Sequence, residues 1–245
     1  MSDSPSTLVL VHGAWGGAWV WRRVLDPLRQ AGHEVHAATL TGDGDRAHLR
    51  RPDISLQTHI DDVVGLVEAE ELENVVLVGH SYGGMVITGA AAALQAAALG
   101  RVSALIYVDA MAPYSGEGWG AGHTPEVAAA RLAIAAEHGN ALPAPDPSDG
   151  FRLSVEDADW LRRRHVPHPF GMYRQPLIYD EALLRSVPRQ FIDCNDPGYP
   201  NIEPMRKRAR ETPGWSIAEI ATGHFPMVTE PDALVKHILS FVDGR

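Results

Sequence analysis

The residues best suited to chemistry gather around one serine. Ser81 stands in the run Gly79-His-Ser-Tyr-Gly83, after the aliphatic residues 75–78 and before an alanine-rich stretch over residues 85–99. The aliphatic run is typical of a buried strand and the alanine-rich stretch of a helix. A serine between glycines at such a strand-to-helix junction is typical of a nucleophile on a sharp turn. Glycine lacks Cβ and relieves crowding at the turn. We therefore predict that Ser81 is a catalytic nucleophile.

A serine hydroxyl near neutral pH needs a base within hydrogen-bond reach. Of the 12 histidines, His224 is the best candidate, because it follows the last apolar run, residues 215–221, in a Gly-His pair. A base in this place after the last strand fits the chain order serine, acid, histidine. His12 and His80 belong to glycine-rich segments, where we expect structural hydrogen bonds. We predict His224 as the general base.

His165 and His168 form an H-x-x-H pattern that could suggest zinc. Pro167 and Pro169 would break a helix there, and no third ligand is evident. We therefore predict neither a metal site nor a cofactor.

The third member of a triad must be a carboxylate that orients the imidazole. Asp109 stands at the end of the strand predicted over residues 102–108, and Asp196 lies in the loop after the strand predicted over 188–193. Both strand ends would lie beside the nucleophile, so geometry permits either. Asp193 is a weaker third option, because it lies within its strand. Our prediction is Asp109, with Asp196 left open as the alternative.

Two main-chain amides are expected to form an oxyanion hole. A glycine-rich loop, residues 12–19, follows the buried strand predicted over residues 8–11. Such a loop supplies one donor, and the residue after the nucleophile supplies the other. We predict the backbone N–H groups of Ala14 and Tyr82 as these donors.

The elements that must position these residues alternate along the chain. Helices are predicted over residues 19–28, 55–71, 85–99 and 231–242, and a further strand over 34–39. Alternation of this kind predicts an α/β fold, with a doubly wound, mostly parallel sheet. Residues 114–187 break the rhythm with glycines, prolines and helices at 125–138 and 154–164, but no obvious strand. We expect a core of residues 1–113 and 188–245 and an inserted, mainly helical cap over residues 114–187.

Composition narrows the setting. The formal net charge of −10 argues against a nucleic-acid or anionic-membrane partner. A single cysteine, Cys194, suits a reducing cytoplasm, and no signal peptide is visible at the N-terminus. The longest apolar run is too short to span a bilayer. We expect a cytoplasmic protein with a small-molecule partner, and the sequence leaves a homodimer open.

Three motifs together resemble one superfamily. His12-Gly-Ala-Trp-Gly-Gly-Ala-Trp-Val-Trp21, Gly79-His-Ser-Tyr-Gly-Gly84 and Gly223-His224 are similar to those of the α/β-hydrolases, within the branch of plant methylesterases, hydroxynitrile lyases and bacterial esterase relatives. The resemblance implies Ser81 as nucleophile, His224 as base and backbone donors near Ala14 and Tyr82. Gly13 and Phe225 stand where the lyases carry threonine and lysine. Some dehalogenases of the superfamily take their acid four residues before a proline, a spacing that Asp109 and Pro113 share.

The leading hypothesis is a cofactor-independent serine hydrolase that cleaves a small, fairly apolar carboxylic ester through an acyl-enzyme. Alternatives are a lactonase or C–C hydrolase with the same triad, a hydroxynitrile-lyase-type lyase, and a non-catalytic ligand receptor on the same scaffold. Aromatic side chains are expected to contact the substrate: Trp15, Tyr82, Trp119, Phe170, Tyr173 and Phe225.

Overall fold

The computed structural model describes residues 5–98, 100–121, 123–148, 151–173 and 175–244. A parallel six-stranded sheet forms its centre, in the order β2-β1-β3-β4-β7-β8. Its strands are β1 (Thr7–Val11), β2 (Glu34–Ala38), β3 (Val75–His80), β4 (Val102–Val108), β7 (Arg189–Cys194) and β8 (Trp215–Ile220). The predicted parallel sheet is confirmed, and each of its strands lies within two residues of the predicted range.

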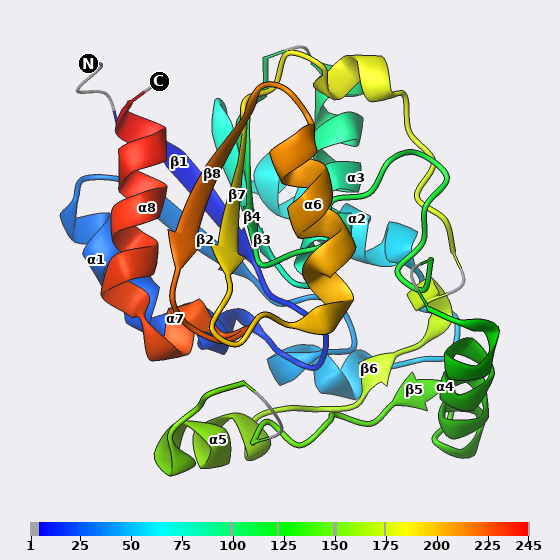
Figure 1. Cartoon of the computed structure of the whole chain (residues 1–245). Coiled ribbons are helices and arrows are strands. Elements are labelled where there is room, and N and C mark those ends of the chain that lie inside the picture. Colours follow the sequence, from blue (N-terminus) through cyan, green and yellow to red (C-terminus); the bar gives the residue numbers. More distant parts are fainter. Residues whose placement is uncertain (1–4, 99, 122, 149–150, 174, 245) are drawn as a thin grey trace.

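Helices cover both faces of the sheet, because successive side chains of a strand point to opposite sides. Leu8 and Leu10 belong to the apolar cluster that contains α1 (Arg22–Gln30) and α8 (Pro231–Asp243). Val9 and Val11 belong to the cluster that contains α2 (Leu56–Ala69) and α3 (Gly83–Ala97). Figure 1 shows these two pairs of helices on opposite sides of the strands. The doubly wound α/β architecture is therefore confirmed.

Local sequence signals set several element ends. The Ser55 side chain accepts a hydrogen bond from the Thr58 amide in a capping box, so α2 begins where predicted. Gly32, with φ +97°, follows α1 as expected for a helix end. In the segment after β2, Leu40 and Asp43 are fully buried and η2 (Gly44–Leu49) is a 3-10 helix. Shorter helices are η1 (Ala18–Trp21), η5 (Pro200–Ile202) and α7 (Pro226–Thr229).

The predicted cap segment carries α4 (Pro125–Glu137), α5 (Val155–Arg162), η3 (Gly171–Tyr173) and η4 (Glu181–Leu184). It also carries a short antiparallel pair that the sequence did not reveal, β5 (Ala141–Leu142) with β6 (His168–Pro169). In Figure 1, α4, α5 and this pair lie beyond the arrowheads of the central strands. That position is the one a cap over the strand ends would take, and the boundaries 114 and 187 remain predictions. No described helix has both the length and the apolar character needed to cross a membrane.

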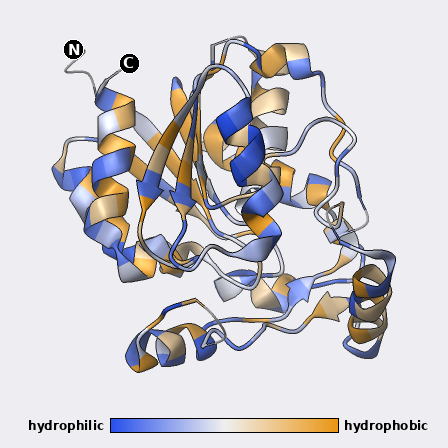
Figure 2. Ribbon diagram, viewed as in Figure 1, coloured by the Kyte–Doolittle hydropathy of each residue, from blue (hydrophilic) through white to orange (hydrophobic). Residues whose placement is uncertain are grey.

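Helix α6 (Glu203–Glu211) is the longest of the described helices that were not predicted. It reads EPMRKRARE and buries only Met205, Arg206 and Ala209. Figure 2 shows it as one of the most hydrophilic segments, in contrast to the hydrophobic strands beside it. Its apolar face is short, with only Met205 and Ala209 in the core, so apolar periodicity gives little helical signal in this segment. Its buried arginine is important for the site described next.

Candidate active site

Ser81 lies on a strained turn between β3 and α3. Its backbone is left-handed, with φ +53°, a conformation that costs a non-glycine residue free energy. A Cβ on Gly79 would lie 2.7 Å from the Gly83 carbonyl oxygen, and a Cβ on Gly83 would lie 2.7 Å from that of Val11. Close packing of strand, turn and helix therefore requires both glycines. The Met111 amide donates to the Ser81 carbonyl at 2.9 Å and ties the turn to the segment after β4.

The structure brings together three side chains that the sequence placed at strand ends. His224 Nε2 lies 2.9 Å from Ser81 Oγ, and His224 Nδ1 lies 2.6 Å from Asp109 Oδ2. Since a carboxylate only accepts, the imidazole donates from Nδ1 and accepts the serine proton at Nε2. Asp109 is fully buried and His224 nearly so. This chain of hydrogen bonds has the geometry of a nucleophile, a base and an orienting acid.

The two alternative acids lie elsewhere. Asp196 is 57% exposed and pairs with Arg152. Asp193 is 1% exposed, but its oxygens receive Arg206 and Arg210 rather than His224. The turn after β7, closed by the bridge between Asn195 and Gly198, carries Asp196 to the surface. Of the three aspartates considered, only Asp109 contacts the histidine.

Two further histidines hold the site in shape. His80 Nε2–H donates to the His224 carbonyl oxygen at 2.7 Å. His12 Nδ1–H donates to the Gly13 carbonyl at 2.6 Å, while its Nε2 accepts from the Leu40 amide at 3.0 Å. Burial lowers the pKa of His12 to about 4 and that of His80 well below its ordinary value. Both rings are therefore neutral and make structural hydrogen bonds, the role expected from the sequence.

Rings surround His224. The ring centroids of Tyr199, His80, Phe225 and Phe151 lie 4.4, 4.7, 5.4 and 5.8 Å from that of the imidazole. Sequence reasoning did not identify Phe151 or Tyr199, because neither belongs to a motif and both come from irregular segments. These rings restrict the imidazole to the orientation in which it contacts Ser81 and Asp109.

The two expected oxyanion donors lie on two segments that meet at Ser81, the loop after β1 and the turn between β3 and α3. Neither the Ala14 nor the Tyr82 amide donates a hydrogen bond to a described residue. The loop after β1 closely approaches the nucleophile, since a Cβ on Gly13 would lie 2.9 Å from Ser81 Cβ. Tyr82 also directly precedes α3, where helix-end amides favour negative charge. The geometry is compatible with both amides binding an oxyanion.

A cavity of about 280 Å³ opens over Ser81. Trp15, Trp119 and Phe225, which the sequence predicts to contact the substrate, are among its lining residues. The prediction that the Tyr82 ring contacts the substrate is wrong. Its side chain is fully buried and its hydroxyl donates to His59 Nδ1 at 3.0 Å. Phe170 and Tyr173 stack on each other and are not among the described lining residues. The rest of the lining includes apolar and aromatic side chains, Met111, Phe151, Tyr199, Ile202 and Met205. It also includes polar ones, Glu117, His123, Arg131, Asn201 and Arg208.

The two histidines of the H-x-x-H pattern lie in different surroundings. His168 Nδ1 lies 2.7 Å from Asp43 Oδ2, and both side chains are fully buried. His165 instead lines the cavity. Within the described residues, no three His, Cys, Asp or Glu side chains are grouped to hold a metal ion.

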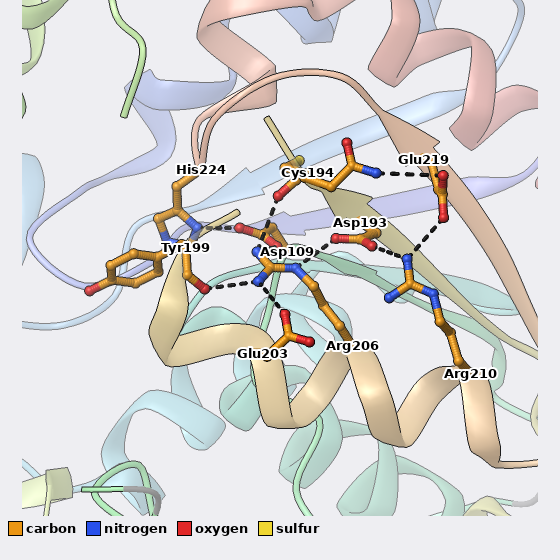
Figure 3. A network of polar contacts seen from close by, with 10 residues as sticks. Asp109, Asp193, Cys194, Tyr199, Glu203, Arg206, Arg210, Glu219 and His224 are labelled. Carbon is orange, nitrogen blue, oxygen red and sulfur yellow. Dashed lines mark hydrogen bonds and ion pairs between the residues drawn. The ribbon is translucent and has the colours of Figure 1, made fainter. Parts of the chain in front are cut away.

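Arg206 lies beside the triad, although no motif in the sequence predicted it. Its guanidinium donates to Asp109 Oδ1 at 2.7 Å, on the side of the carboxylate opposite His224 (Figure 3). A buried carboxylate needs a hydrogen-bond donor for each of its oxygens, so a second partner of Asp109 could have been expected. The sequence does not show which residue that partner is.

The chain is similar to known proteins of one family. Residues 8–237 match the model of the alpha/beta hydrolase family. The chain is 38% identical to a carbendazim hydrolyzing esterase of Nocardioides sp. (strain SG-4G), over 95% of this chain and 98% of that protein. It is 36% identical to the probable esterase PIR7A of Oryza sativa subsp. indica, over 98% and 97% of the two chains.

A solved structure has the same fold. An extracellular alpha/beta-hydrolase from a Paenibacillus species, described as sharing structural and functional homology with tobacco salicylic acid binding protein 2, superposes with a TM-score of 0.83. The two chains are 22% identical, and the match covers 96% of this chain and 98% of the other. With a family match over almost its whole length and relatives above 30% identity, the chain belongs to the alpha/beta hydrolase family.

Proposed function

We propose that this protein is a serine esterase that cleaves small, fairly apolar esters without a cofactor. The single observation that carries the proposal is the hydrogen-bonded chain from Ser81 Oγ through His224 to Asp109 at the base of a cavity. A serine hydroxyl held 2.9 Å from an imidazole that a buried carboxylate orients is activated for attack on a carbonyl carbon.

The reaction follows from these contacts. Ser81 Oγ attacks the ester carbonyl while His224 Nε2 takes its proton, and Asp109 stabilises the imidazolium that forms. The oxyanion is bound by the amides of Ala14 and Tyr82, and loss of one such donor costs about 3 kcal/mol. His224 returns the proton to the departing alcohol. Water then attacks the acyl-enzyme with His224 again as base, and the acid is released.

The cavity supports a small substrate. Its volume of about 280 Å³ lies near the lower end of ligand pockets, about 300–1,000 Å³. Aromatic and aliphatic side chains contribute much of its lining, which favours an apolar acyl or alcohol group. The names of the relatives are consistent with an esterase. Because one of them is named for hydrolysing carbendazim, that compound is a second candidate substrate.

Ester turnover and active-site labelling together test the proposal. We expect the wild type to hydrolyse p-nitrophenyl acetate and butyrate, and a fluorophosphonate probe to label Ser81, located by peptide mass spectrometry. Ser81→Ala should lose both labelling and all but residual turnover, by about 10⁴-fold or more in kcat. Carbendazim and a cyanohydrin are tested as further substrates in the same assay.

Other outcomes would contradict the esterase. Cyanohydrin cleavage without ester turnover would identify a lyase. A folded protein that binds an ester but neither turns it over nor accepts the probe would be a receptor. Preferred turnover of lactones or of a C–C bond, with Ser81 labelled, would keep the triad and change the substrate class.

A further inference from the structure

The carboxylate of Asp109 has two partners on opposite sides. Oδ2 receives His224 Nδ1–H at 2.6 Å, and Oδ1 receives Arg206 Nη2–H at 2.7 Å. Asp109 is 0% exposed and the Arg206 side chain 3% exposed. A buried carboxylate is stable only when it is paired and hydrogen-bonded. Because His224 is neutral when it acts as a base, Arg206 is the permanent counter-charge in contact with Asp109.

Arg206 is itself held by a complete set of acceptors. Besides Asp109, its guanidinium donates to Asp193 Oδ1 at 2.6 Å and to Glu203 Oε2 at 3.3 Å. Two carbonyl oxygens accept as well, those of Tyr199 at 2.9 Å and Cys194 at 3.1 Å. Figure 3 shows how these contacts join α6 to the ends of β4 and β7. Such a fork is rigid, since the planar group has donors in fixed directions.

Charges alternate outward from the triad. Asp109 is followed by Arg206, then Asp193, then Arg210, which pairs with Asp193 and, at 2.9 Å, with Glu219. Asp193 is 1% exposed, whereas Arg210 is 42% exposed and therefore screened by water. The two buried groups nearest to the triad acid thus carry opposite charges and should act on it in opposite directions.

We propose that Arg206 is a positioning residue of the catalytic triad, and that Arg206 and Asp193 together set the pH range in which His224 acts as a base. The proposal rests on the serine-esterase function proposed above. Arg206 fixes the Asp109 carboxylate in the plane that His224 needs, and its charge stabilises the ionised acid beside a neutral imidazole. Asp193 also pairs with Arg206, and its negative charge partly offsets the stabilisation that Arg206 gives to ionised Asp109.

Other charged and titratable groups also face this pair. From β3, the neutral His80 packs on the His224 ring, and the Tyr199 ring packs on it from the loop after β7. Burial keeps the pKa of Cys194, at the end of β7, well above its ordinary value, so the thiol carries no charge. Glu203 is on α6 and largely exposed. None of these groups changes in the variants chosen below.

The sign of each effect follows from the charge removed. Protonation of the Asp109–His224 pair changes its charge from −1 to 0, and the active form is the −1 form. Arg206→Gln removes the cation that stabilises this form, so the acid limb of kcat/KM should move to higher pH, by about one unit or more. Asp193→Asn removes an anion that destabilises it, so the acid limb should move to lower pH.

Two more variants separate charge from shape. Arg206→Lys keeps the charge but loses the fork, so kcat should fall at least about tenfold while the acid limb moves by much less than in Arg206→Gln. Lys207→Gln removes a positive charge from the same helix at an exposed residue that forms an ion pair with Glu211. Its pH profile should match that of the wild type.

The experiment is a set of pH profiles of kcat/KM for p-nitrophenyl butyrate, with each active fraction counted by fluorophosphonate titration. Opposite shifts of the acid limb in Arg206→Gln and Asp193→Asn, with Lys207→Gln unmoved, are the expected result. A uniform loss of activity with unmoved limbs would assign Arg206 a merely structural role and overturn the proposal. Should Arg206→Gln fail to fold, Arg206→Lys and Asp193→Asn still carry the test.

A second readout does not depend on turnover. The downfield proton resonance of His224 Nδ1–H, followed by NMR against pH, should shift its titration in the same opposite directions. Absence of turnover in the wild type would contradict the proposed esterase. The NMR titration would then still support or overturn the role of Arg206, because it requires no substrate.

Discussion

At the scale of single residues, the site concentrates backbone strain. Trp15, Ser81 and Asp109 have φ values of 66°, 53° and 42°, in the left-handed region that favours glycine. Such a conformation costs about 1–3 kcal/mol for each residue. Hydrogen bonds compensate: the Asp109 amide donates to the Ile192 carbonyl at 2.8 Å, and Trp15 Nε1 donates to that of Leu142 at 2.9 Å. The strained residues present the nucleophile, the acid and a cavity wall.

Trp119 should limit the length of the acyl chain. Its ring lines the cavity and packs edge-on against Trp15 at 6.1 Å between ring centroids. Trp119→Ala should enlarge the cavity and raise the ratio of kcat/KM for p-nitrophenyl octanoate over acetate by about tenfold. Trp160→Ala, on α5 and outside the described lining, is the matched control. An unchanged ratio in Trp119→Ala would show that this ring does not bound the acyl site.

At the scale of elements, one glycine fixes how closely α3 packs on the segment after β4. A Cβ on Gly84 would overlap the carbonyl oxygen of Met111, whereas a Cβ on Gly65, exposed in α2, would meet nothing within 4 Å. Gly84→Ala should therefore lower the unfolding free energy by more than about 3 kcal/mol and displace the Ser81 turn. Gly65→Ala should raise it by about 0.5–1 kcal/mol. Urea unfolding measures both, and a mild effect at Gly84 would contradict this packing.

The same scale explains what could be predicted from the sequence. Strand β3 and the Ser81 turn were predictable because an apolar run, paired glycines and an alanine-rich helix are local signals. Helix α6 was not, because only two of its apolar residues, Met205 and Ala209, enter the core, and polar contacts such as those of Arg206 supply much of its packing. The choice between Asp109 and Asp196 depends on where each chain segment turns after its strand. That is a tertiary property which no local pattern encodes.

At the scale of the whole molecule, buried neutral histidines link folding to pH. Burial lowers the pKa of five histidines: to about 4 for His12, His59 and His165, to about 3 for His168, and well below the ordinary value for His80. The unfolded chain therefore takes up protons as the pH falls through about 6.5, while the folded chain does not until about pH 4. The stability they contribute is complete above about pH 6.5 and is lost as the pH falls toward 4. Burial raises the pKa of Asp43 to about 7, which opposes this trend, but with one group against five.

Unfolding free energy should therefore fall steeply on acidification. Each unbalanced proton contributes at most about 1.4 kcal/mol per pH unit, so five histidines against one carboxyl give at most about 5 kcal/mol per pH unit between pH 6 and 5. Urea unfolding followed by circular dichroism at those two values tests the slope. The exposed His138→Gln should leave it unchanged. Equal stability at pH 6 and 5 would mean that the buried imidazoles are protonated in the folded protein.

The most direct test of the account compares two aspartates. We would measure kcat/KM for p-nitrophenyl butyrate with Asp109→Asn and Asp196→Asn, each checked for folding by circular dichroism. Because Asp109 contacts His224 and Asp196 pairs with Arg152 at the surface, Asp109→Asn should lose about 10³–10⁴-fold and Asp196→Asn less than about threefold. The reverse order would assign the acid to Asp196 and contradict the triad described here.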